Sequence, residues 1–149
     1  MWVLIRLAIG CIFLLSSFST LLSPYQNFLY VVQAYQMLPS WAELLVAHTM
    51  PWFELLVGFL VFFGLWTSLG LRLAAVLFGT FIVVVGQALL RGLPLESCGC
   101  FGEWIHLKPQ MVLILDSASL LTVLLLLGRL QGVKNLSLDA WFDKNERRS

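Results

Sequence analysis

The chain has 149 residues, of which 60% are hydrophobic and 11% charged, whereas soluble domains carry about 25% charged residues. Its mean hydropathy is +0.90 and its formal net charge is +1. The composition excludes a large aqueous domain, and the charge gives no reason to expect a nucleic acid partner. We therefore predict an integral membrane protein of a few spanning helices, each of which needs about 20 apolar residues.

Four apolar runs are long enough to cross a bilayer. The first covers Trp2–Leu22, and we expect it to stay as a span because no small-x-small cleavage pattern follows it. The remaining runs are Glu43–Trp66, Leu71–Leu90 and Gln110–Gly128. They lack the alternation of barrel strands, so the predicted fold class is an all-α integral membrane four-helix bundle.

The segment between the first two runs is amphipathic. Apolar side chains recur there at helical spacing, with tyrosine and tryptophan at the edges: Phe28, Val31, Val32, Tyr35 and Leu38. This pattern predicts an interfacial helix, which lies either in the membrane surface or against the end of the bundle.

The basic residues predict the orientation of the bundle. Only Arg91 and Lys108 fall on one side, and the other seven basic residues fall on the opposite side: Arg6, Arg72, Arg129, Lys134, Lys144, Arg147 and Arg148. Since Lys and Arg are retained on the cytoplasmic side, we predict that both termini are cytoplasmic in a bacterial inner membrane. The loop from Arg91 to Pro109 then faces the periplasm. Residues 131–149 are predicted to form a polar cytoplasmic tail beyond a membrane domain of residues 1–130.

The outer loop carries Cys98 and Cys100, separated by one glycine. A disulfide needs its α-carbons roughly 4.4 to 6.8 Å apart, which residues two apart reach only where the chain bends, and Gly99 permits such a bend. The resulting ring is strained and therefore easily reduced. Arg91 and the start of a helix at Pro109 favour the thiolate form of these cysteines.

Three chemistries fit this cysteine pair. The pair can exchange electrons with the thiols of a partner, form a structural disulfide, or bind zinc together with His48 and His106. One residue between two cysteines is shorter than the usual zinc spacing of two to four, so we assign no metal ligands. Glu96 and Glu103 lie in the same loop and oppose thiolate formation.

Two carboxyl residues are predicted inside the membrane. Glu54 and Asp116 each lie about seven residues from the outer end of their run, which places both near 10 Å deep in the outer half. Such residues usually face the bundle interior or a cavity, and we expect Gln87 and Arg91 as their partners. They are either structural ties or proton carriers. Oxidation of two thiols releases two protons and two electrons, which a quinone in the bilayer would accept.

Three smaller features also carry expectations. Pro51 is expected to kink the second span and to leave room for a pocket. Gly79 and Gly86 are expected to allow close helix packing, and Cys11 to pack as a small apolar residue.

Three stretches resemble one known family, the methylamine utilisation protein MauE family within the DoxX-like membrane proteins. They are "AYQMLPSW" at 34–41, "MPWFELLVGFLVFFGLW" at 50–66 and "LLRGLPLESCGCFG" at 89–102. The resemblance covers about the first 130 residues. It implies a four-helix membrane protein that assists maturation of a periplasmic enzyme, such as methylamine dehydrogenase, together with a thioredoxin-like partner. It also implies that Cys98 and Cys100 are the redox pair.

We therefore predict a membrane thiol-disulfide redox protein. Its catalytic candidates are Cys98, Cys100, Glu54, Asp116 and Arg91. Its expected partners are the bilayer and a thioredoxin-like protein or a larger membrane complex. We expect no covalently bound cofactor, and a quinone is the candidate electron acceptor. The alternative is a non-catalytic anchor or assembly subunit of a respiratory or electron-transfer complex, in which a loop disulfide fixes a docking surface.

Overall fold

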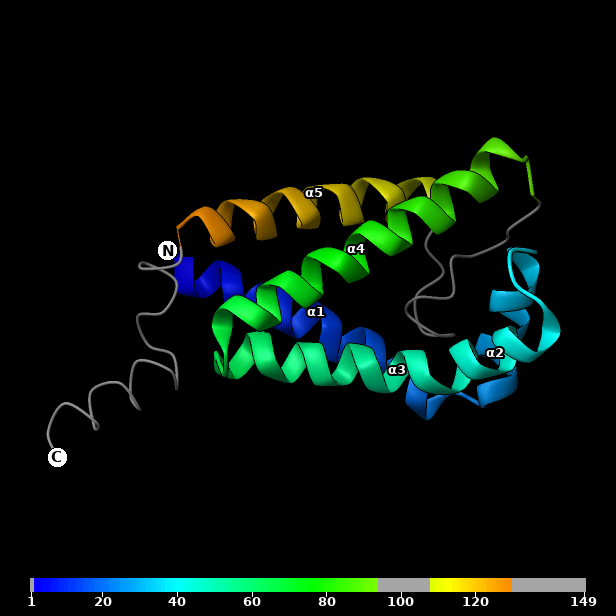
Figure 1. Cartoon of the computed structure of the whole chain (residues 1–149), viewed down its shortest axis with the longest axis horizontal. Coiled ribbons are helices and arrows are strands. Elements are labelled where there is room, and N and C mark those ends of the chain that lie inside the picture. The colour runs from blue at the N-terminus through cyan, green and yellow to red at the C-terminus, as the bar shows by residue number, and fades with distance from the viewer. Residues whose placement is uncertain (1, 94–107, 130–149) are drawn as a thin grey trace, which may run out of the picture.

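The computed structural model describes residues 2–93 and 108–129, and every regular element within them is a helix (Figure 1). These elements are α1 (Trp2–Leu22), α2 (Tyr25–Ala34), α3 (Ser40–Phe63), α4 (Thr67–Leu90) and α5 (Pro109–Gly128). All except α2 are long and apolar enough to cross a membrane. The predicted all-α bundle of four spans is therefore confirmed.

The bundle has two distinct ends (Figure 1). At one, which we call the hairpin end, α3 is joined to α4 through residues 64–66. We call the other end the α2 end. There, α2 lies beside the start of α3, and the C-terminal end of α4 lies close by. The predicted grouping of basic residues by side follows this topology, since Arg72 and Arg129 belong to the hairpin end and Arg91 and Lys108 to the α2 end.

The hairpin end is built by a glycine in the left-handed conformation. Gly64 ends α3 with φ 66°, and its amide donates to the carbonyl of Leu60, as at many helix C-termini. Thr67 then starts α4, and its hydroxyl donates to the carbonyl of Gly64 at 3.1 Å. The connection is therefore tight, and α3 and α4 are antiparallel neighbours as predicted.

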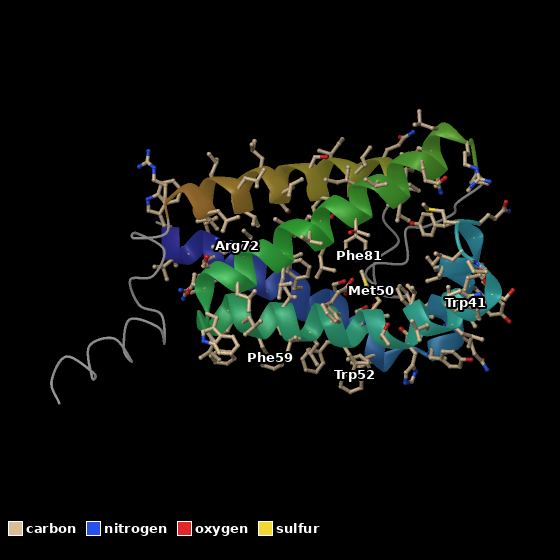
Figure 2. All side chains as sticks on the ribbon, in the orientation of Figure 1. Trp41, Met50, Trp52, Phe59, Arg72 and Phe81 are labelled. Atoms are coloured by element: carbon tan, nitrogen blue, oxygen red, sulfur yellow. The ribbon has the colours of Figure 1, made fainter. Side chains whose placement is uncertain are left out.

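Two tryptophans mark the length of the second span. Trp41 and Trp66 are 73% and 71% exposed at its two ends. Helix α3 has 24 residues and is about 36 Å long at 1.5 Å per residue, so a tryptophan at its start and one just beyond its end lie near the two interfaces of a bilayer whose hydrocarbon core is about 30 Å thick. Between them, Trp52 and Phe59 point away from the bundle (Figure 2), as lipid-facing side chains do.

Helices α1 and α3 meet through glycine. A Cβ added to Gly10 would lie 2.9 Å from the Cα of Phe62, and one added to Gly58 would lie 3.0 Å from Cδ2 of Leu14. Gly79 and Gly86 face open space in the described structure, so the predicted packing role of these two residues is wrong. The close helix approach lies between the first and second spans and at Gly70 near the start of the third, where an added Cβ would lie 3.2 Å from Cβ of Leu60.

The buried core is divided into two apolar clusters. The cluster at the hairpin end includes Ile9, Phe13, Val57, Val61, Leu71, Ala74, Leu77, Phe78, Val123 and Leu126. The cluster at the α2 end is smaller and consists of Tyr35, Val85, Ala88 and Val112. Cys11 belongs to neither cluster and is exposed on α1, so its expected packing as a small apolar residue is not within the described core.

Candidate functional site

The end of α4 is tied to the connection between α2 and α3. Gln87 Nε2 donates to the carbonyl of Tyr35 at 3.2 Å. Arg91 Nη1 donates to the carbonyl of Gln36 at 3.3 Å and to Oε1 of Gln87 at 3.3 Å. Gln36 has a positive φ of 49°, which a non-glycine residue adopts only when its surroundings hold it. We call this group the α4 clamp.

The α4 clamp corrects one expectation. Gln87 and Arg91 were predicted to pair with Glu54 and Asp116 inside the membrane. Their side chains instead hold each other and the backbone carbonyls of the link between α2 and α3. Arg91 is exposed at the end of α4, where the α4–α5 connection begins, so it remains a candidate for a role in that connection.

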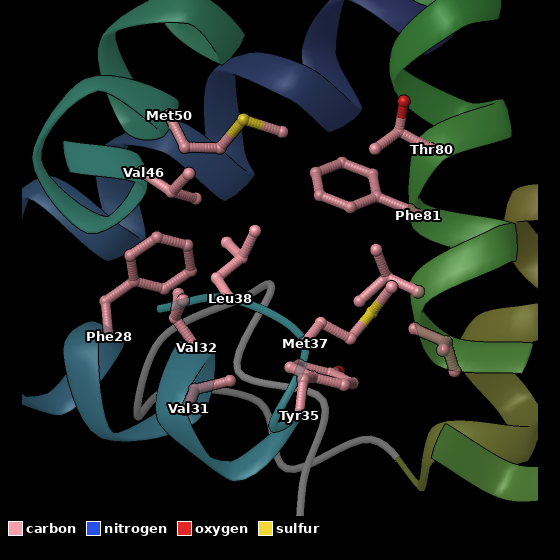
Figure 3. A pocket seen from close by; sticks show the side chains of 12 residues that line it. Phe28, Val31, Val32, Tyr35, Met37, Leu38, Val46, Met50, Thr80 and Phe81 are labelled. Atoms are coloured by element: carbon pink, nitrogen blue, oxygen red, sulfur yellow. The ribbon is translucent and has the colours of Figure 1, made fainter. Parts of the chain in front are cut away.

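A cavity of about 330 Å³ lies between α2, α3 and α4 (Figure 3). Its lining is almost wholly apolar and comprises Phe28, Val31, Val32, Tyr35, Met37, Leu38, Val46, Met50, Thr80, Phe81, Val84 and Val85. Met50 and Phe81 point toward one another across the space between α3 and α4 (Figure 2). The cavity adjoins Pro51, where a pocket was expected, although α3 continues through the proline as one helix.

Glu54 is buried at the interface of α1 and α3. Its side chain is 4% exposed, and Ser16 on α1 donates its hydroxyl to Oε2 of Glu54 at 3.1 Å. Thr20 follows one turn later on α1 and donates to the carbonyl of Ser16 at 3.0 Å. The Ser16–Glu54 hydrogen bond thus crosses between two helices, whereas the Thr20 hydrogen bond stays within α1.

Asp116 is buried in α5, with 5% of its surface exposed. Within the described residues, its Oδ2 atom is enclosed and accepts no hydrogen bond. A buried acceptor left in this state destabilises a fold by about 1 to 3 kcal/mol. Its retention in an apolar helix therefore favours a functional reading over a purely structural tie.

The two carboxyls lie at different distances from the starts of their own helices. Glu54 is 14 residues from Ser40, where α3 begins, and 11 residues from Glu43, so the predicted distance of about seven residues from the end of its run is wrong. Asp116 is seven residues from the start of α5. The separations from the starts of α3 and α5 correspond to about 21 Å and about 10 Å along the helices. Glu54 lies one turn beyond Met50 on α3. Because the two lengths are counted from the starts of two different helices, they do not compare the depths of the two carboxyls, and the common depth of Glu54 and Asp116 stays a prediction.

Cys98, Gly99 and Cys100 lie outside the described residues, as does His106. The described chain stops at Leu93 and resumes at Lys108, and both residues belong to the α2 end. Pro109 is the first residue of α5, as predicted. Among the described residues, no group of three or more His, Cys, Asp or Glu side chains could hold a metal ion.

Comparison with known proteins identifies the family. The model of the methylamine utilisation protein MauE family matches residues 1–130. The chain belongs to this family. The resemblance predicted from the sequence is thus confirmed, and together with the four spanning helices it makes the chain a multi-pass membrane protein of the MauE family. No curated protein and no solved structure matches the chain.

Sequence reasoning missed two parts of this MauE-family site. The role of Ser16 had no distinct signal, because serine in a membrane helix commonly bonds to its own backbone. The cavity had only the indirect signal of Pro51. Its walls come from four separate segments, each of which reads as ordinary apolar sequence by itself.

Proposed function

We propose that this MauE-family protein is a membrane thiol-disulfide redox protein that supports disulfide formation during maturation of a periplasmic enzyme. Cys98 and Cys100 are the exchanging pair, and a thioredoxin-like protein is the thiol partner. Arg91 supports the thiolate form of the pair from the end of α4. Glu54 and Asp116 carry the released protons.

The proposal is carried by two buried carboxyls, Glu54 and Asp116, in the membrane spans. The same protein has the Cys-Gly-Cys sequence in the connection between α4 and α5. Neither Glu54 nor Asp116 is neutralised by Arg91, the basic residue at the end of α4, because Arg91 is held in the α4 clamp. Carboxyls in this setting mark proton pathways in many membrane proteins. A structural disulfide alone would release no protons for them to carry.

The thiol exchange and the reoxidation of the cysteine pair are balanced in electrons and protons. A substrate dithiol reduces the Cys98–Cys100 disulfide through a mixed disulfide, and the substrate leaves as a disulfide. Reoxidation of the Cys98–Cys100 dithiol forms one S–S bond and releases two electrons and two protons. A quinone dissolved in the bilayer takes up both electrons and both protons and becomes a quinol.

Thiol trapping tests the exchange. In a Cys11→Ala background, only the two loop cysteines react with a maleimide reagent. We expect Cys98 and Cys100 to be modified in membranes treated with a reduced thioredoxin-like protein and protected once an oxidant is supplied. The Cys98→Ser/Cys100→Ser variant should fail to support maturation of the host enzyme.

The carboxyls are tested in the same assay. Glu54→Gln and Asp116→Asn should slow reoxidation of the pair, whereas Glu43→Gln should not. Glu43 is the matched control because it is also a buried carboxyl of α3 but lies in its first turn. A pair that stays oxidised under every condition, with the double serine variant fully competent in the host, would instead identify an assembly subunit.

A further inference from the structure

The cavity between α2, α3 and α4 interrupts the apolar core. On α4, buried core residues stop at Phe78 and resume at Val85, and the cavity residues Thr80, Phe81 and Val84 occupy the interval. Protein interiors are normally close-packed, and the lining of an empty cavity loses the contacts that atoms inside it would make. A ligand that fills this interval would therefore stabilise the α2 end.

Helix α2 contributes three apolar side chains to the cavity. None of the residues of α2 is buried, and Phe28, Val31 and Val32 line the cavity (Figure 3). The apolar face of this amphipathic helix is thus only partly covered by other residues of the described chain. An apolar occupant of the cavity would cover it further.

The lining favours a hydrocarbon chain as the occupant. It is almost wholly apolar, and the hydroxyl of Thr80 already donates to the carbonyl of Val76 at 2.8 Å. A polar ligand would lose its hydrogen bonds to water without replacement, and apolar cavities do not hold water. The volume of about 330 Å³ gives room for about ten methylene groups if each takes as much space as a water molecule, about 30 Å³.

The position of the cavity along α4 matches the acyl-chain region of a bilayer. Thr80–Val85 lie five to ten residues before Leu90, where α4 ends, which corresponds to roughly 8 to 15 Å along the helix. The headgroup region takes about 5 to 8 Å on each side of the hydrocarbon core, so these residues face hydrocarbon. Met37 and Leu38 line the cavity and are themselves exposed, so a chain can enter from the side of the bundle.

A positive charge lies at the rim of the same cavity. Arg91 directly follows Leu90 and is exposed. Its Nη1 donates to the carbonyl of Gln36 at 3.3 Å, and Gln36 is the residue between Tyr35 and Met37, which both line the cavity. A guanidinium carries five N–H donors in a planar fork that suits a phosphate. A phosphate at the end of α4 would therefore have a cationic partner, with the cavity open to its acyl chain.

We propose that the cavity binds one acyl chain of an anionic phospholipid whose phosphate is held by Arg91. An anionic lipid is favoured over phosphatidylcholine, because the choline cation of the latter already lies beside its phosphate. The inference goes beyond the proposed function and needs no reaction of the cysteine pair. It bears on that function at one point: a phosphate beside Arg91 offsets its charge and so weakens the support that Arg91 gives to the thiolate form of the pair.

Binding can be measured on the full chain without any thiol chemistry. The Cys98→Ser/Cys100→Ser protein is placed in nanodiscs of phosphatidylcholine with a trace of phosphatidylglycerol that carries a diazirine in its acyl chain, and the labelled residues are mapped by mass spectrometry. We expect labelling concentrated on the segments that contain Phe28, Met50 or Phe81. Unlabelled phosphatidylglycerol should compete at least about fivefold better than diacylglycerol, which has the same chains but no phosphate.

A matched pair of variants tests the location of the chain. Val84→Trp fills the cavity, whereas Val83→Trp adds the same bulk to a neighbouring side chain that is 64% exposed on the outside of α4. We expect the first variant to weaken binding at least about tenfold and the second to change it by less than about twofold. If Val84→Trp does not fold, Val46→Phe replaces it, with exposed Leu45→Phe as its control.

A second pair tests the headgroup contact. Arg91→Gln removes the charge at the rim, and Arg72→Gln removes an exposed arginine of the hairpin end. We expect Arg91→Gln to abolish the preference for phosphatidylglycerol over diacylglycerol and Arg72→Gln to keep it. The ratio of the two lipids separates loss of charge from loss of the α4 clamp, because a distorted cavity would weaken the binding of both lipids alike.

Three results would overturn the inference. Equal labelling of Val84→Trp and Val83→Trp, or labels spread evenly over the exposed side chains of α5, would reduce the bound lipid to the general lipid shell. Equal competition by phosphatidylglycerol and diacylglycerol would remove the headgroup site at Arg91. A folded protein whose cavity takes no label would leave the cavity to a side chain of a partner protein. None of these results depends on thiol exchange, so the proposed function stands or fails separately by thiol trapping.

Discussion

The two ends of this bundle are packed in different ways. At the hairpin end, α1 and α3 touch through Gly10 and Gly58, and a large apolar cluster fills the interior. At the α2 end, four residues form the second cluster, and a cavity of about 330 Å³ takes the place of further side chains. The same four helices thus provide a close-packed half and an open half.

Because of this difference, the packing that stabilises the bundle and the cavity lie in different halves of the molecule. In lipid, helix association depends on close van der Waals packing and on interhelical hydrogen bonds, and the hairpin end supplies the packing. The open half can then keep a cavity and buried carboxyls without loss of the fold. It is held by a few polar contacts, in particular the α4 clamp, because the apolar contacts there are few.

The largest effect is expected in the close-packed half. Gly10→Val places side-chain atoms against the backbone of Phe62 and should lower the free energy of unfolding by about 3 kcal/mol. Gly79→Val is the matched control on open space and should lower it by less than about 1 kcal/mol. Titration with sodium dodecyl sulfate in mixed micelles measures both values. Equal losses would contradict the division of the bundle into two kinds of packing.

An intermediate effect is expected where the two halves meet. Ser16→Ala removes the hydroxyl that donates to Glu54 and should destabilise the protein by about 1 to 3 kcal/mol, because a buried acceptor loses a donor. Ser117→Ala is the control, since the exposed Ser117 hydroxyl donates to the carbonyl of Leu113 on the same helix. It should change the free energy of unfolding by less than about 0.5 kcal/mol. An equally small effect of Ser16→Ala would mean that the contact with Glu54 contributes nothing to stability.

The smallest global effect is expected at the α4 clamp. Arg91→Ala should lower the free energy of unfolding by about 1 kcal/mol or less, because its hydrogen bonds are exposed. Its local effect should be larger: amide hydrogen exchange at residues 36–38 should rise, since the α2–α3 link loses a contact to α4. Arg72→Ala, at an exposed arginine of the hairpin end, should leave exchange at these residues unchanged. Equal exchange in the two variants would show that the link is held by packing alone.

The spans could be predicted from the sequence with little error. The first helix has the predicted bounds, and α5 begins one residue before the predicted start because Pro109 takes the first helical position. The bounds of α1 and the start of α5 depend on continuous apolar runs and on residues such as proline that mark a helix end. Both can be read directly from the sequence. The MauE resemblance depends on short motifs of the same kind, and it is confirmed over residues 1–130.

The partners of individual side chains could not be predicted in this way. Gln87 and Arg91 are one turn apart beside a membrane span, and the sequence suggested the nearest buried carboxyls as their partners. The positive φ of Gln36 turns its carbonyl toward Arg91 instead. Likewise, several glycines of the spans could support a close helix contact, but among the described residues Gly10, Gly58 and Gly70 approach another helix, whereas Gly79 and Gly86 do not.

The sequence by itself determined that this is an all-α membrane protein of four spans in the MauE family, because span length, hydropathy and family motifs are properties of the chain read in order. The tertiary structure alone decided that Glu54 accepts a hydrogen bond from Ser16 on α1, that the α4 clamp holds the α2–α3 link, and that a cavity opens between α2, α3 and α4. These features depend on which faces of distant helices meet. A contact between two helices depends on how well both of their surfaces fit together. It therefore cannot be predicted from the sequence of either helix alone.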